Sequence, residues 1–311
     1  MENEITEGLK QRGSEPNFAQ FVSYAGRMLD STAGRAGWSE LSGNCRLGWY
    51  EKLYREPLKA MTEGEQFTRE LHQAALSDHS GVEQALEMAA QKLGLKMTQG
   101  RSSTQAASPK DALDVVKQAV TEARVASLAA LAPLTPAEHS ELQQGLYRVL
   151  TEQNVHGHTL EDRVSGRRQL DLREKTDRST VYSAALALAP LADARLLEQL
   201  RSLPNDGNIA VEGVTGTVAQ RVATSAGDIL IGGKGKNVYE LDKMPGICAV
   251  IDLGGGDEYP EGTVSPERPV LVVIDLAGND AYIATKPGAQ GGAVLGVSML
   301  LELEGNDVYR A

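Results

Sequence analysis

The sequence predicts an α+β protein in which an all-α N-terminal region is followed by a C-terminal parallel β-solenoid of about four coils. Helix-start signals and helical spacing of apolar residues fill the first two-thirds of the chain. Short β-branched runs and frequent glycine replace them after Pro204, and a glycine-rich turn ending in tyrosine recurs four times. The predicted regions are helical 1–97, a linker 98–108, helical 109–204 and a glycine-rich solenoid 205–311.

The first 97 residues carry two helix starts that are marked by capping residues. The segment 62–65 (TEGE) has the spacing of a capping box. Ser80 precedes Val82 and Leu86, which recur at helical spacing, and Gly94 follows as a helix stop. The pattern therefore predicts helices in this region and no strand.

The second helical region begins after a segment without apolar periodicity. Residues 98–108 (TQGRSSTQAAS) are rich in Gly, Ser, Thr and Gln, so they are predicted to form a flexible linker. Helix signals resume at Ser108-Pro109 and at Thr135-Pro136, where a capping residue precedes a proline at the first helical position. Two further helices are predicted near 160–175 and 179–202, with the second interrupted by Pro190.

Four aliphatic runs after Pro204 each lead into a turn that ends in tyrosine. The runs are Asp228–Ile231, Ala249–Leu253, Val270–Leu276 and Val297–Leu303, and the turns end at Tyr239, Tyr259, Tyr282 and Tyr309. The tyrosines are 20, 23 and 27 residues apart, which is typical of a solenoid whose outer loops vary in length. Each run is predicted to pair with its counterparts about 4.8 Å away, and the four tyrosines are predicted to stack in one column. Glycine in each turn is predicted to adopt a positive φ.

The segment Gly232–Glu240 resembles the glycine-rich nonapeptide of the repeats-in-toxin family, G-G-x-G-x-D-x-U-x, with Asn237 at the aspartate position. The later copies keep only the second half of that motif, G-x-D-x-Y, and they are not contiguous. The region of about residues 225–311 also resembles uncharacterised bacterial proteins in which GNDxY turns and QG-x-G segments, here Gln290–Val297, follow a helical region. The resemblance implies a parallel β-roll with Ca²⁺ bound between successive turns. It gives no information about catalytic activity.

Stacked coils would place six acidic residues in two columns. The favoured interpretation is that each aspartate accepts hydrogen bonds from its own turn. Like charges one coil apart also repel, and a hard cation with oxygen ligands would relieve that repulsion, so Ca²⁺ is the candidate ion. In a further alternative, paired carboxylates act as acid and base in a carbohydrate lyase or hydrolase. The predicted metal ligands are Asp257, Asp280 and Asp307 in one column and Asp252, Asp275 and Glu302 in the other.

Other chemically active residues lack the partners that a site needs. Cys45 and Cys248 have neither metal-ligand spacing nor an evident histidine partner, so both are predicted to be buried thiols. His156 and His158 lie between two predicted helices without a third spaced ligand, and a metal site there is a weaker alternative. The stretch Gly232–Gly235 lacks the ending of a nucleotide-binding loop.

The composition argues against several classes of partner. The net charge of −11, without a run of Lys or Arg, argues against nucleic acid. No apolar run approaches the roughly 18 residues that a membrane span needs, and MENEITEGLK lacks a hydrophobic signal segment. A cytoplasmic location is the default expectation. Export without an N-terminal signal stays open, because repeats-in-toxin proteins leave the cell in that way.

The last turn suggests a role in assembly. No capping element follows Tyr309, and a terminal coil presents unpaired backbone groups, so the solenoid end is predicted to bind a protein partner or to self-associate. The predicted function is a non-enzymatic scaffold or binding module built on a β-solenoid, with Ca²⁺ as a candidate stabiliser. The alternatives are the carbohydrate-active enzyme and a processed subunit whose solenoid is completed by a partner chain. The sequence assigns no catalytic role to a particular residue, and whether the protein is an enzyme stays open.

Overall fold

The computed structural model describes residues 2–35, 48–77, 80–96, 106–151 and 160–311. The chain forms two compact units. The first comprises residues 1–77 and 84–96, and the second comprises residues 78–83 and 97–311. Most of the predicted linker 98–108 lies outside the described residues.

The described residues before position 97 are helical, as predicted, and the first predicted helix starts earlier than expected. The helix begins at Lys59, and Leu58 at its N-cap makes no side-chain hydrogen bond. The TEGE segment therefore lies inside the first turns, because Lys59, Ala60 and Met61 favour helix strongly enough to extend it backwards. The helices are α1 (Glu2–Gln11), α2 (Glu15–Arg35), α4 (Gly48–Arg55), α5 (Lys59–Ala75) and α6 (Gly81–Lys92).

The helices after residue 105 begin where their capping residues predict. Ser108 accepts a hydrogen bond from the Asp111 N–H at 3.2 Å, and Thr135 and Glu138 form a reciprocal capping box. Pro190 lies in a short 3₁₀ segment that ends one helix before the next begins, as expected for proline within a helical pattern. These elements are α7 (Pro109–Leu131), α8 (Pro136–Thr151), α9 (Leu160–Glu174), α10 (Arg178–Leu188), η1 (Ala189–Ala192) and α11 (Ala194–Leu200).

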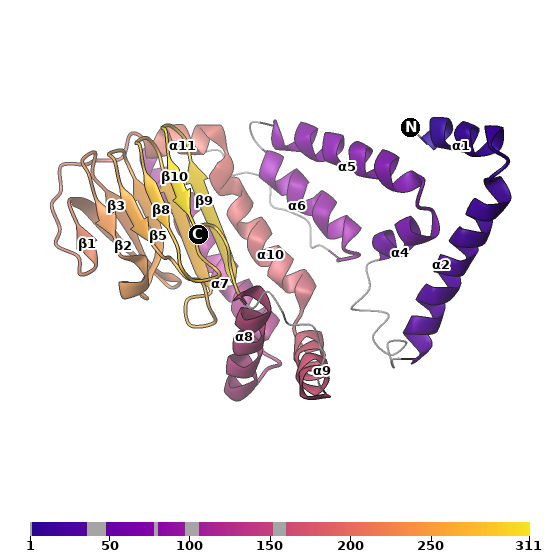
Figure 1. The fold of residues 1–311 in the computed structure, drawn as a ribbon. Coiled ribbons are helices and arrows are strands. Elements are labelled where there is room, and N and C mark those ends of the chain that lie inside the picture. Colours follow the sequence, from indigo (N-terminus) through magenta and orange to yellow (C-terminus); the bar gives the residue numbers. More distant parts are fainter. Residues whose placement is uncertain (1, 36–47, 78–79, 97–105, 152–159) are drawn as a thin grey trace. The chain divides into compact units, whose positions relative to one another are not determined.

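The C-terminal strands form a solenoid of two sheets (Figure 1). The helix-facing sheet has the order β2-β3-β5-β7-β9, and the tyrosine sheet has the order β1-β4-β6-β8-β10. The strands are β1 (Val214–Thr215), β2 (Val218–Thr224), β3 (Gly227–Gly232), β4 (Val238–Tyr239), β5 (Ile247–Asp252), β6 (Glu258–Pro260), β7 (Val270–Asp275), β8 (Ala281–Ile283), β9 (Val297–Glu302) and β10 (Val308–Arg310).

Four coils stack in parallel, as the sequence predicts. Coil 1 consists of β3 and β4, coil 2 of β5 and β6, coil 3 of β7 and β8, and coil 4 of β9 and β10. All pairs between coils are parallel. The sequence pattern did not reveal β1 and β2, which pair antiparallel with coil 1 and cover its outer edge.

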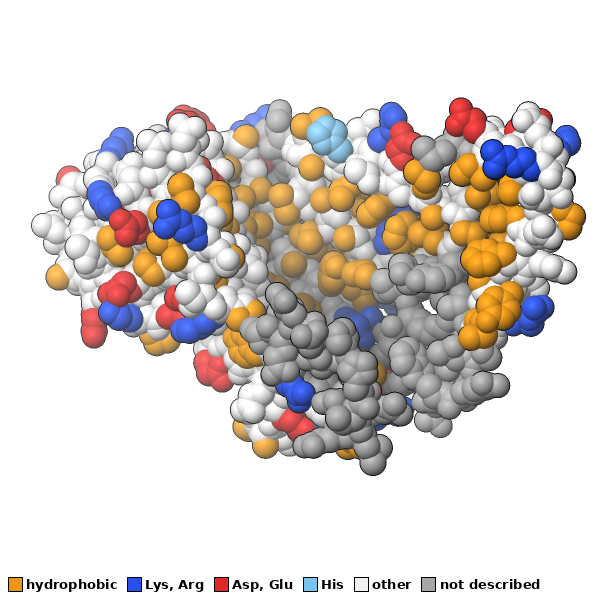
Figure 2. All heavy atoms as spheres, in the orientation of Figure 1, with side chains coloured by type: hydrophobic (Ala, Val, Ile, Leu, Met, Phe, Trp, Pro, Cys, Tyr) orange, Lys and Arg blue, Asp and Glu red, His pale blue; other side chains and the backbone are white. Residues whose placement is uncertain are grey.

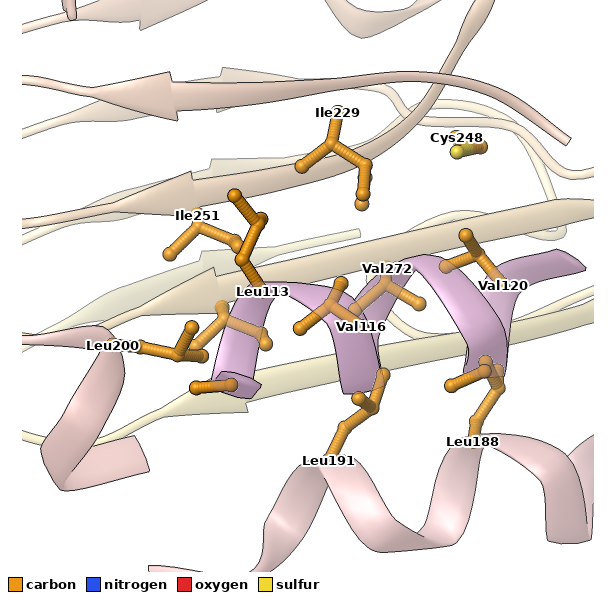
Figure 3. Close-up of a cluster of buried hydrophobic side chains, with 14 of the residues drawn as sticks. Leu113, Val116, Val120, Leu188, Leu191, Leu200, Ile229, Cys248, Ile251 and Val272 are labelled. Atoms are coloured by element: carbon orange, nitrogen blue, oxygen red, sulfur yellow. The ribbon is translucent and has the colours of Figure 1, made fainter. Parts of the chain in front are cut away.

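The inner strands β5 and β7 of the helix-facing sheet are buried on both faces, which explains their continuous aliphatic runs. Alternate residues such as Ile229 and Ile251 contact the helices, whereas Leu230 and Val250 point toward the tyrosine sheet. Val116 of α7 lies directly over this sheet (Figure 3). Helices α7, α10 and α11 therefore share one hydrophobic core with the helix-facing sheet, whereas α8 and α9 pack in a separate cluster that includes Leu142 and Leu172. The helices, the helix-facing sheet and the tyrosine sheet form three successive layers.

Candidate functional site

Parallel stacking in register brings the predicted acidic and tyrosine columns together. Asp252 pairs with Asp275, which in turn pairs with Glu302 along the helix-facing sheet. On the tyrosine sheet, the rings of Tyr239, Tyr259, Tyr282 and Tyr309 stack with centroid separations of 5.2, 4.8 and 4.9 Å. Because equivalent residues of successive coils share a register position, the predicted tyrosine column is confirmed.

Each tyrosine hydroxyl of the first three coils donates a hydrogen bond to the acidic residue of the next coil. Tyr259 of coil 2 donates to Asp275 of coil 3 at 2.6 Å. Tyr239 donates to Asp252 in the same way, and Tyr282 donates to Glu302. Burial raises the pKa of Tyr259 well above its ordinary value, so the phenol keeps its proton and remains the donor. The hydroxyls therefore tie the coils together in one direction along the solenoid.

The turn aspartates also link successive coils, which the own-turn interpretation does not include. The Asn237 N–H donates to Asp257 at 2.6 Å, the Asp257 N–H to Asp280 at 2.5 Å, and the Asp280 N–H to Asp307 at 3.0 Å. Parallel stacking places each of these carboxylates within reach of the backbone of the preceding coil. Own-turn bonds occur as well, because Asp257 also accepts from the Gly256 N–H and, in the other column, Asp252 accepts from the Gly254 N–H at 2.8 Å.

Close packing by carboxylates, rather than backbone conformation, explains several turn glycines. The sequence predicts a positive φ at each turn, and Gly254 and Gly305 show one. Gly255 and Gly278 have no positive φ, but a Cβ at Gly255 would lie 2.7 Å from an Asp257 oxygen. A Cβ at Gly278 would overlap with the carboxylate of the turn aspartate in the same coil. The prediction of positive φ is wrong at these two positions, where the missing side chain makes room for the carboxylates.

In coil 1, neutral residues occupy the two positions that carry acidic residues in the other coils. Gly232 occupies the position of Asp252, and a Cβ there would overlap with both the Asp252 carboxylate and the Tyr239 hydroxyl. Asn237 occupies the position of Asp257, and its amide nitrogen donates to Tyr239 and to Asp252, each at 3.0 Å. The side-chain oxygen of Asn237 accepts from the Thr217 N–H at 2.6 Å. Sequence reasoning missed this role of Asn237, although its exception to the repeated aspartate was visible.

The central carboxyl groups are removed from solvent. Asp252 and Asp275 are 0% exposed, Asp257 is 1% exposed and Asp280 is 2% exposed. Burial, followed by repulsion from the Asp252 carboxylate, raises the pKa of Asp257 to about 7. Burial raises the pKa of Asp275 to about 8, with further contributions from the neighbouring acids. The pKa of Asp252, Asp280 and Glu302 is also raised, in each case chiefly by burial.

Carboxylate oxygens gather at two places inside the solenoid. The first group contains Asp252, Asp257 and Asp275, and the second contains Asp275, Asp280 and Glu302, with one oxygen of each residue within 4.8 Å of the others. Among the described residues, one oxygen each of Asp257, Asp280 and Glu302 is buried without a hydrogen-bond partner. Buried acceptors of this kind call for a donor, a proton or a cation. Asp307 takes part in neither group.

Acidic groups at the surface, in contrast to the interior groups, lie beside basic side chains. On the face shown in Figure 2, basic and acidic side chains are interspersed over the solenoid. Lys236 contacts Glu258 at 2.7 Å, and Arg201 contacts Glu304 at 2.7 Å. Such exposed pairs contribute little free energy, but they show that outer carboxylates have basic neighbours. In the described part of the chain, the two interior groups have no such ion pair.

The remaining predicted candidates contribute no site. Cys248 is 1% exposed and packs in the core, as predicted, and burial raises the pKa of its thiol to about 11. Cys45, His156 and His158 lie outside the described residues.

A further polar network lies in the loops outside the columns, where the sequence showed no motif. Arg268 is 7% exposed and donates to Asp242 at 2.9 Å and to the Thr263 carbonyl at 3.0 Å. Lys286 also donates to Asp242, at 3.0 Å. Burial opposes ionisation of Asp242, but hydrogen bonds from Thr263 and Lys286 lower its pKa to about 2. The network links the irregular connections between successive coils, from the coil 1–coil 2 connection (Asp242) to the coil 3–coil 4 connection (Lys286).

A comparison with protein-family models finds no match, and comparisons with curated proteins and with solved structures find no significant similarity. Within the described residues, no single helix has the length and apolar character needed to cross a membrane. One bent pair, Arg178–Ala192 with Ala194–Leu200, meets those criteria together. The buried leucines of that pair, such as Leu188 and Leu200, pack in the hydrophobic core.

Proposed function

We propose that the protein is a non-enzymatic β-solenoid scaffold and binding module, with Ca²⁺ held between its coils. The observation that carries this proposal is the burial of the repeated carboxyl groups, combined with their bonds from one coil to the next. Asp275, for example, is 0% exposed and accepts from Tyr259 of the preceding coil. Groups in this position hold the coils together and make the stack rigid.

Burial also argues against the carbohydrate-active alternative. A glycosidase needs two carboxyl groups that flank an accessible glycosidic bond, so that one protonates the leaving oxygen while the other attacks or activates water. Asp252, Asp257 and Asp280 are at most 2% exposed, and a sugar has no access to them in this fold. Their raised pKa values follow from burial and need no catalytic role.

The interior carboxylates suit a hard cation. Ca²⁺ takes six to eight oxygen ligands, and Asp257, Asp280 and Glu302 each have a buried oxygen that lacks a donor. Two adjacent positions would share Asp275, which belongs to both carboxylate groups. The raised pKa values keep buried carboxyl groups protonated near neutral pH. A bound Ca²⁺ would displace those protons, so uptake of Ca²⁺ would release protons.

The binding role belongs to the edge formed by β9 and β10. Both strands have one neighbour in their sheets among the described residues, and Tyr309 is 53% exposed. An open strand edge offers backbone donors and acceptors to an added strand. We infer that a protein partner adds to this edge, in agreement with the last alternative from the sequence, a subunit completed by another chain.

Thermal unfolding followed by circular dichroism tests the cation and the scaffold together. Ca²⁺ at a hundred times its dissociation constant should stabilise the protein by about 2.7 kcal/mol, a rise of several degrees in Tm relative to chelator. Asp280→Ala should reduce the rise, because it removes one of the two carboxylate groups, whereas Asp206→Ala, which removes an exposed carboxylate, should leave the rise unchanged.

Two other results would change the proposal. An equal Tm in Ca²⁺ and chelator would remove the cation and leave protons as the occupants of the interior. Cleavage of a polysaccharide that is lost in a folded Asp280→Asn variant would replace the scaffold with the enzyme.

A further inference from the structure

The hydrogen bonds between coils run in one direction, and the last coil leaves its donors without acceptors. Coils 1, 2 and 3 each donate a tyrosine hydroxyl and a turn N–H to acidic residues of the following coil. In coil 4, Glu302 and Asp307 accept from coil 3. The Tyr309 hydroxyl and the Asp307 N–H have no acceptor among the described residues.

The aromatic column is open at the same place. One face of the Tyr309 ring stacks on Tyr282 at 4.9 Å, and the residue is 53% exposed. Val308, in the same strand, is 45% exposed, whereas the corresponding strands of coils 2 and 3 are half-buried or buried throughout. The edge thus offers two hydrogen-bond donors, an aromatic ring and the backbone of β9 and β10.

A second copy of this chain does not complement that edge. Two coil 4 edges facing each other would place hydroxyl and N–H donors opposite donors, with Glu302 and Asp307 adding like charge. The other end of the solenoid is covered by β1 and β2, which pair antiparallel with coil 1. Coil 1 also has Gly232 and Asn237 at the positions where acids would be needed.

We propose that the β9–β10 edge binds a strand–turn–strand segment that carries the acidic and aromatic residues of a further coil. The spacing within this chain defines the segment: an acid, an aspartate five residues later and an aromatic residue two residues after that, as in Asp275, Asp280 and Tyr282. The acid accepts from the Tyr309 hydroxyl, the aspartate accepts from the Asp307 N–H, and the aromatic ring covers Tyr309. This inference rests on the proposed binding role of the edge and names what that edge recognises.

A peptide copied from coil 3 provides the probe. A fluorescein-labelled peptide with the sequence of residues 269–284, flanked by lysines for solubility, is titrated with the full chain in chelator, and anisotropy gives the dissociation constant. The substitution Asp275→Asn in the peptide should weaken binding by up to about tenfold, because a neutral amide oxygen replaces a charged carboxylate as the acceptor. Light scattering verifies that the peptide is monomeric.

A double-mutant cycle separates specific pairing from general strand addition. Tyr309→Phe removes only the exposed hydroxyl, so the protein stays folded, and the penalty for Asp275→Asn in the peptide should fall until both peptides bind about equally. Tyr24→Phe, which removes a hydroxyl that is also exposed, serves as the matched control and should preserve the full penalty.

Each remaining outcome refutes a defined part of the reasoning. If the original peptide and its Asp275→Asn variant bind the unaltered protein equally, recognition of the acid is refuted, while a strand-binding edge is preserved. Absence of binding by every peptide would refute both the inference and the binding role. Ca²⁺-dependent stability would be unaffected in either case, because the two interior carboxylate groups do not include Tyr309 or Asp307.

Discussion

Raising the pH from 5 to 9 in the absence of divalent cations should lower the thermal stability of the solenoid. Burial raises the pKa of Asp275 from 3.8 to about 8 in the folded chain. Between those two values the folded protein holds a proton that the unfolded chain has released, so stability falls as the pH rises. The stabilising contribution is complete below pH 3.8 and is lost as the pH passes through about 8. Asp257, with its pKa raised to about 7, acts in the same direction.

The size of the effect follows from the linkage of protons to folding. One pH unit changes the contribution of one such group by about 1.4 kcal/mol, so Asp275 alone loses about 4 kcal/mol between pH 5 and pH 8. For a unit of this size, about 4 kcal/mol corresponds to a fall in Tm on the order of 10 °C. The net charge of −11 at pH 7 adds to the trend through self-repulsion. Asp242, whose pKa is about 2, is ionised at every pH from 5 to 9 and therefore does not contribute to this change in stability.

Circular dichroism melts at pH 5, 6, 7, 8 and 9 in chelator measure this dependence. Asp275→Asn should flatten the curve by the contribution of one proton and should raise Tm at pH 9, because it removes a desolvated charge. Asp206→Asn, at an exposed position, should follow the curve of the unaltered protein. A Tm that stays level from pH 5 to pH 8, or an Asp275→Asn variant with an unchanged slope, would refute the assignment of buried, proton-retaining carboxyl groups.

Three substitutions test the packing by urea unfolding. Tyr259→Phe should lower the unfolding free energy by about 1–3 kcal/mol, because Asp275 loses its hydroxyl donor in a buried site; an unchanged midpoint would contradict the tie between coils. Ile251→Ala should cost about 2–5 kcal/mol, since Ile251 is 0% exposed in the shared core, and a cost below about 1 kcal/mol would contradict that burial. Gly232→Ala should cost about 1–3 kcal/mol through overlap with Tyr239, whereas a stabilised protein would show that coil 1 has room for a side chain.

The repeated pattern of the C-terminal region was enough to predict the columns. Strand residues alternate between two faces, so aligning the coils on Tyr259 and Tyr282 also aligns Asp252 with Asp275. The helix starts at Ser108 and Thr135 were also predictable, because a capping side chain forms its hydrogen bond within the first turn of its own helix. The direction of the aspartate bonds was not predictable, since an N–H of the same turn and one of the neighbouring coil are chemically equivalent donors until the coils are stacked.

By itself, the sequence determined the fold class, the helical and solenoid regions, the parallel register and the identity of the residues in each column, because these depend on periodicity and on contacts between positions that repeat. Only the tertiary structure decided that α7 packs on the helix-facing sheet, that Arg268 reaches Asp242, and that one oxygen of Asp257 is buried without a donor. An apolar stripe shows that a helix has a buried face but does not name the surface that covers it. Burial of a carboxyl oxygen likewise depends on every neighbour at once, and this burial gives the columns their raised pKa values.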